Sequence, residues 1–192
     1  MLFGTDFFLI LAAFSVAAPW TQGWGRIRCL VQGCCHGKIT SSNIGIRYFH
    51  ERSRVVGISE LTGEYLHPTP VYSILTNIVI GIFLAKLWLF NAPLTFIIGI
   101  YLILSGLGRF AEEHYRGEPQ TPIIAGLRLY QWIALIGTIT GAFFTTISHP
   151  VDTIDIQLST ETLIIATLLG LLAIFLTGID FPHSNRRFSR LA

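Results

Sequence analysis

Five long apolar stretches constrain the fold of this 192-residue chain more than any other feature. They cover about residues 2–20, 71–90, 94–110, 127–147 and 162–179. A helix that crosses the hydrocarbon core of a bilayer needs about 20 apolar residues, and each stretch is close to that length. Because a helix satisfies its own backbone hydrogen bonds within lipid, the sequence predicts an all-α integral membrane protein with about five transmembrane helices.

Composition supports this fold class. The chain is 52% hydrophobic and only 12% charged, whereas soluble domains carry roughly 25% charged residues. The net charge of +2 argues against a nucleic-acid partner. The first apolar stretch lacks the basic start of a secretory signal peptide and contains Asp6, so we expect it to remain as a membrane span.

A long polar segment, residues 23–68, follows the first apolar stretch. Its glycines and the alternating pattern at residues 44–49 predict a small irregular cap with one hairpin. Thr69 and Pro70 then predict the start of the second span, with a capping hydroxyl and a proline at the first helical position.

The remaining connections divide the chain further. Asn91-Ala92-Pro93 predicts a tight turn between the second and third spans, and residues 112–121 predict a short polar loop. We expect residues 1–150 to form one membrane domain, and residues 151–192 to add an extra apolar helix and a basic tail.

Two arginines, Arg26 and Arg109, lie near the ends of apolar stretches. Ionisable residues at bilayer depth are costly and usually mark functional sites. Guanidinium groups bind phosphate oxygens in pairs, so the two arginines predict a site for a phosphate-bearing lipid head group. Glu113 shares a helix face with Arg109 and could orient it, and Arg116 follows one turn later. The alternative is an interfacial salt-bridge ladder where a span meets water.

The three cysteines, Cys29, Cys34 and Cys35, lie within seven residues of one another. Their odd number and close spacing argue against a disulfide framework. The spacing C-x4-C-C-H fits no common zinc pattern, and adjacent cysteines rarely both face one ion, so we expect no metal and no cofactor. A thiol or metal protein that uses these cysteines with His36 remains an alternative hypothesis.

Several short motifs together resemble the C-terminal half of the prolipoprotein diacylglyceryl transferase family. The resemblance runs from about residue 6 to residue 147, and the Gly-Cys-Cys-x-Gly motif resembles a paralogous branch. Each motif is weak alone, but their order and their placement against the spans are specific. The matching positions are Gly25-Arg26-Ile27, Gly33, Gly37, His67-Pro68-Thr69, Tyr72, Arg109-Phe110, Glu113, Arg116, Pro119 and Gln131.

This resemblance implies an enzyme of lipoprotein biosynthesis in the bacterial inner membrane. Such an enzyme moves diacylglyceryl from phosphatidylglycerol to the lipobox cysteine thiol of a preprolipoprotein signal peptide. Arg26, Arg109 and Glu113 would be catalytic, with the two arginines on the phosphate and Glu113 orienting Arg109. The implied substrate-binding residues are Gly37, His67, Tyr72, Arg116 and Gln131. His67 could also be a general base or an ordinary loop histidine.

The sequence also departs from the family pattern. Cys29 and Cys34 stand where the family signature commonly has asparagine and glutamate, and the spans of the family's N-terminal half have no counterpart here. An alternative hypothesis is therefore a non-catalytic lipid-binding subunit that a complementary membrane subunit completes. The basic tail predicts a cytoplasmic cap by the positive-inside rule. The family topology implies a periplasmic cap and site, and we adopt it.

Overall fold

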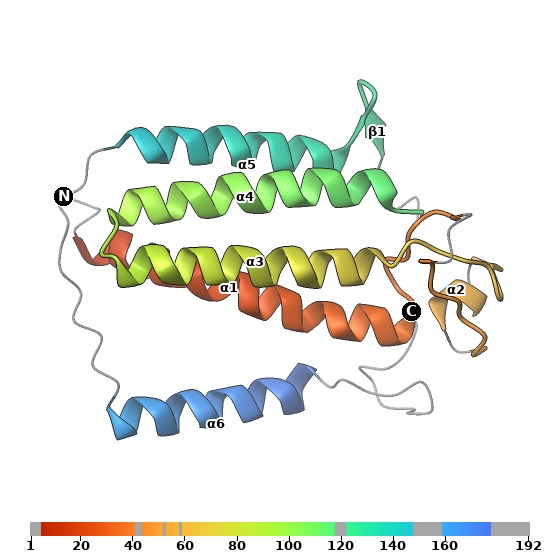
Figure 1. The fold of residues 1–192 in the computed structure, drawn as a ribbon, viewed down its shortest axis with the longest axis horizontal. Helices are drawn as coiled ribbons and strands as arrows, with labels where there is room; N and C mark the ends of the chain where they lie inside the picture. Colours follow the sequence, from red (N-terminus) through yellow and green to blue (C-terminus); the bar gives the residue numbers. More distant parts are fainter. Residues whose placement is uncertain are drawn as a thin grey trace.

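The computed structural model describes residues 5–40, 44–51, 53–57, 59–117, 122–147 and 159–177. Four long helices lie side by side in Figure 1: α1 (Thr5–Gln32), α3 (Thr69–Leu89), α4 (Leu94–Tyr115) and α5 (Leu129–Thr146). A fifth helix, α6 (Thr160–Thr177), is also apolar. The core between α1, α3 and α4 is built from small and aliphatic side chains, among them Ala12, Leu84 and Ile97.

The prediction of an all-α membrane protein is confirmed. Within the described residues, three segments are long and apolar enough to cross a membrane: Phe7–Gln32, Thr69–Leu89 and Leu94–Tyr115. The other two apolar stretches also form helices, α5 and α6, of 18 residues each. The basic tail and the acidic loop at residues 152–155 lie outside the described residues.

The first helix is longer than the sequence predicts. We expected the cap to begin at residue 23, but α1 continues through Arg26 and Cys29 to Gln32, with Pro19 inside it. The continuation packs on α3, because a Cβ atom at Gly23 would lie only 3.4 Å from the Cβ of Asn77. Small residues that admit a neighbour in this way stabilise membrane helices despite low helix propensity.

Helix α4 also extends beyond its apolar stretch. The prediction that a polar loop begins at residue 112 is wrong, because α4 continues to Tyr115. Arg109, Glu112 and Glu113 therefore belong to one continuous helix and project at fixed angles from it. The predicted turn at Asn91-Ala92-Pro93 is confirmed, with Asn91 at φ 52° between α3 and α4.

The cap contains a single short helix, α2 (Arg54–Gly57), among its described residues. The hairpin expected at residues 44–49 is not seen in the described part of the cap, where Ile46 pairs with Leu66 in an isolated antiparallel bridge. The described hairpin lies instead between α4 and α5, formed by β1 (Ile123–Ile124) and β2 (Leu127–Arg128).

The start of α3 is where predicted, but its capping differs. Thr69 and Pro70 open the helix, as expected. The Thr69 hydroxyl does not cap α3, because it donates to the backbone carbonyl of Cys35. This bond ties the first turn of α3 to the chain that leaves α1.

Two glycines form the crossing of α4 and α5. A Cβ atom at Gly141 would lie 2.6 Å from the carbonyl oxygen of Gly99. We expect Gly141→Val to destabilise the protein by about 1–3 kcal/mol, because overpacking forces the two helices apart. Thermal unfolding in detergent would measure the loss.

The matched control is Gly137→Val in the same helix, where no atom of a packed neighbour lies within 4 Å of an added Cβ. This variant should unfold close to the wild-type temperature. Equal destabilisation by both substitutions would mean that helix propensity, rather than the close crossing, sets the effect.

Candidate active site

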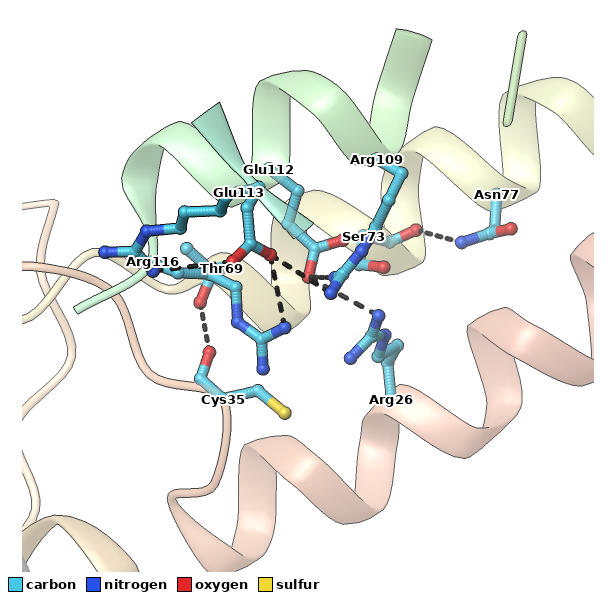
Figure 2. A network of polar contacts seen from close by, with 10 residues as sticks. Arg26, Cys35, Thr69, Ser73, Asn77, Arg109, Glu112, Glu113 and Arg116 are labelled. Atoms are coloured by element: carbon cyan, nitrogen blue, oxygen red, sulfur yellow. Dashed lines mark hydrogen bonds and ion pairs between the residues drawn. The ribbon is translucent and has the colours of Figure 1, made fainter. Parts of the chain in front are cut away.

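Two arginines from different helices meet on one carboxylate oxygen. Nη2 of Arg26 on α1 lies 3.4 Å from Oε1 of Glu112 on α4, and Nη1 of Arg109 lies 3.0 Å from the same oxygen (Figure 2). Both arginine side chains are 23% exposed, whereas Glu112 is 7% exposed. The predicted pair is thus brought together, and Glu112 holds it.

Glu113 forms a second, deeper carboxylate centre. Its side chain is 1% exposed and contacts three guanidinium groups. Arg109 Nη2 lies 3.1 Å from Oε2, Arg116 Nη1 lies 3.5 Å from the same oxygen, and Arg128 Nη1 lies 3.4 Å from Oε1. The Arg109 guanidinium also stacks on Tyr130 of α5, with its carbon 4.7 Å from the ring centre. Arg109 is therefore held in position from two sides.

A cavity of about 520 Å³ opens beside the arginine pair. All its lining residues come from α1, α3 and α4, and Arg26, Arg109 and Glu112 lie on its wall. These three groups leave a surplus of one positive charge on the described wall. Gly25 also lines the cavity, and no atom of a packed neighbour lies within 4 Å of the place of its missing Cβ. The site therefore suits a ligand with a negative charge.

An apolar groove adjoins this cavity. Thr76, Ile80 and Gly108 line both hollows, and the groove continues along α3 and α4 past Val79 and Phe83. Its volume is about 620 Å³. A charged cavity that continues into an apolar groove fits an amphipathic molecule with a polar head and hydrocarbon chains.

Known proteins are similar to most of this chain, including the residues of this site. The family model for prolipoprotein diacylglyceryl transferase matches residues 2–147. The chain belongs to this family. A phosphatidylglycerol–prolipoprotein diacylglyceryl transferase of Clostridium tetani is 33% identical over 130 residues, which are 67% of this chain and 49% of that protein.

A second relative is phosphatidylglycerol–prolipoprotein diacylglyceryl transferase 2 of Clostridium perfringens. It is 33% identical over 99 residues, which are 52% of this chain and 36% of that protein. The chain thus spans about half or less of the length of these relatives. No solved structure shows significant similarity to the chain.

The substrate-binding residues that the family resemblance implies differ in whether they line the cavity. Tyr72 lines the cavity. His67 is not among the lining residues, but its Nδ1 lies 3.2 Å from the Tyr72 hydroxyl. The His67 ring also lies 5.2 Å, centre to centre, from the ring of Tyr115, another lining residue. His67 therefore contacts both Tyr72 and Tyr115 and can orient these two rings, which line the cavity.

Gly37, Arg116 and Gln131 also lie outside the cavity lining. The Gly37 amide donates to the His67 carbonyl at 3.0 Å, and a Cβ at Gly37 would clash with His67. Arg116 is buried against Glu113. Gln131 accepts a bond from the Arg128 amide at 3.0 Å, at the start of α5. These three residues therefore hold neighbours of the cavity in position and do not line it themselves.

Sequence reasoning missed the central role of Glu112. The spacing held part of the signal, because Arg109 and Glu112 are three apart on one helix. The second partner, Arg26, lies on another helix, and only the folded bundle brings it to the same oxygen. Pro119 lies outside the described residues.

Proposed function

We propose that this chain transfers diacylglyceryl from phosphatidylglycerol to the lipobox cysteine thiol of a prolipoprotein. The observation that carries this proposal is the shared cavity of Arg26 and Arg109. Its surplus of one positive charge matches the single negative charge of a phosphodiester. The adjoining apolar groove offers a place for the acyl chains. The chain's relatives carry this activity in their names.

The chemistry gives the two arginines a defined task. The thiolate sulfur of the acceptor forms a bond to the terminal glyceryl carbon, and the bond from that carbon to the phosphate oxygen breaks. Glycerol phosphate leaves with the bonding electrons, and the proton that the thiol gives up to form the nucleophile is balanced by uptake of a proton on the departing phosphate. The departing phosphate gains negative charge, and donors fixed beside it stabilise that charge most in a site that excludes water.

Glu112 holds the two guanidiniums close together before substrate binds. The carboxylate neutralises part of their charge and restricts where their N–H groups point. A phosphate that enters the cavity would take the remaining donors of Arg26 and Arg109. Preorganised donors need little rearrangement as charge develops, which lowers the barrier.

A transfer assay tests the proposed function. The full chain, inserted into phosphatidylglycerol vesicles, should increase the mass of a synthetic lipobox peptide by one diacylglyceryl group. A peptide with serine in place of the acceptor cysteine, and vesicles of phosphatidylcholine, should give no product. Absence of product from folded, inserted protein would contradict catalysis by this chain alone.

The second candidate function is a lipid-binding subunit that a complementary membrane subunit completes. Cys29 favours it, because this thiol lines the cavity where the family signature commonly has asparagine. In that case the chain should bind phosphatidylglycerol without transfer, and product should appear only when the partner is expressed with it.

We further propose that the cap and the site face the periplasmic side of the inner membrane. Arg109, Glu112 and Glu113 lie in the last two turns of α4, next to the cap, so cap and site share one side of the bundle (Figure 1). A periplasm-specific reporter fused within the cap should be active. Activity of only a cytoplasmic reporter there would reverse this orientation.

A further inference from the structure

The three cysteines, which the transfer reaction does not use, gather into one cluster. Their sulfur atoms all lie within 4.8 Å of one another. Cys29 comes from the end of α1, and the other two come from the turn that follows it. A metal ion with bonds of about 2.3 Å to thiolate sulfur holds three sulfurs about 4 Å apart. Small side-chain adjustments would therefore suffice for all three to bind one ion.

The backbone explains how adjacent cysteines face one point. Cys35 has a φ of 59° and Gly33 has a φ of 70°, so the chain turns sharply around Cys34. A non-glycine residue seldom adopts such a left-handed conformation unless its surroundings hold it there. The hydroxyl of Thr69 holds the Cys35 carbonyl (Figure 2). This turn removes the sequence-based objection that neighbouring cysteines point apart.

The cluster adjoins a cationic group, because Cys29 and Arg26 line the same cavity. Thiolate is the form that binds metals. A monovalent cation would neutralise one of three thiolate charges, and the guanidinium of Arg26 would offset part of the remainder.

We propose that Cys29, Cys34 and Cys35 form a three-thiolate site for monovalent copper. Soft sulfur ligands select soft cations such as Cu⁺ and Zn²⁺. Zinc in proteins almost always takes four ligands, whereas copper(I) accepts three thiolates. Among the described residues, no further cysteine, histidine, aspartate or glutamate joins the cluster. This site adjoins the proposed transfer cavity, because Cys29 lines it, but the proposal does not depend on transfer.

A copper titration tests the site. The full-length protein, reduced and purified in detergent, is titrated with Cu⁺ in competition with a chromogenic copper(I) chelator. One Cu⁺ per chain should bind, and all three thiols should lose their reactivity toward a maleimide. Loss of an outer-shell partner can weaken a metal site by roughly 100-fold, so Cys34→Ser, which removes a direct ligand, should weaken binding by at least that factor.

His36 provides a matched control. It adjoins Cys35 in sequence, but its Nε2 lies 3.0 Å from the Ser59 hydroxyl and its Nδ1 lies 3.0 Å from the Gly37 carbonyl. His36→Gln should therefore bind Cu⁺ as the wild type does. Thermal unfolding checks that each variant folds, and alkylation of the folded wild-type thiols replaces Cys34→Ser if that variant does not.

Four results would overturn the proposal. They are no stoichiometric Cu⁺ on the reduced wild-type chain, wild-type affinity in Cys34→Ser or in the alkylated protein, equal loss of copper in His36→Gln, and retention of Zn²⁺ in preference to Cu⁺. None of these results bears on diacylglyceryl transfer, which the lipobox peptide assay measures separately.

Discussion

Arg109→Ala is expected to lower the rate of diacylglyceryl transfer by at least about 100-fold, the usual effect of removing one fixed donor from a developing negative charge. Arg109 lies on the cavity wall and is held by Glu112, Glu113 and Tyr130. Alanine removes the guanidinium that would face the departing phosphate. The lipobox peptide assay in phosphatidylglycerol vesicles measures the loss.

A matched control comes from the cap. Arg47 is exposed and lies over the ring of Tyr65, with its guanidinium carbon 4.6 Å from the ring centre, and it does not line the cavity. Arg47→Ala should therefore keep near wild-type transfer. Full activity of Arg109→Ala in folded, inserted protein would contradict the assignment of the phosphate site.

Arg26→Ala should behave like Arg109→Ala, since both guanidiniums contact the same oxygen of Glu112. Groups that act as one unit show non-additive losses, so the double variant should be little slower than either single variant. Additive losses would show instead that the two arginines serve independent steps. The same vesicle assay, with rates corrected for inserted protein, separates the two outcomes.

The arginine pair could be predicted from the sequence because a charge near bilayer depth is costly. The apolar stretches predicted which segments are helical, but they placed the ends of α1 and α4 too early. Hydropathy records where a segment contacts lipid, whereas a helix continues as long as its neighbours pack against it. Arg26 and Glu112 lie in these continuations. Their ion pair therefore depends on helical residues that lie beyond the apolar stretches.

The supporting residues show a second limit of sequence reasoning. The family resemblance implies that Gly37 binds substrate, but in the structure Gly37 packs against the backbone of His67 and does not line the cavity. Gln131 similarly bonds the Arg128 amide. A motif shows that a residue matters in the family without showing whether it contacts substrate or holds a residue that does. That distinction needs the contacts between helices.

Glu113→Ala should have the largest effect on stability, about 3–5 kcal/mol, the usual result of removing one partner from a buried ion pair. Glu113 is 1% exposed and contacts Arg109, Arg116 and Arg128. Without its carboxylate, three guanidiniums remain close together at the junction of α4 and α5, and they repel one another. Thermal unfolding of the purified protein in detergent measures this loss.

Two variants separate the charge of Glu113 from its packing. Glu113→Gln keeps the volume and one acceptor oxygen, so its stability should fall between those of the wild type and Glu113→Ala. Glu64→Ala removes an exposed carboxylate from the cap and should change the stability by less than about 0.5 kcal/mol. If Glu113→Ala unfolded at the same temperature as Glu64→Ala, the carboxylate would not be what holds the arginines at the end of α4. The position of Arg109 in the cavity would then need a different physical cause.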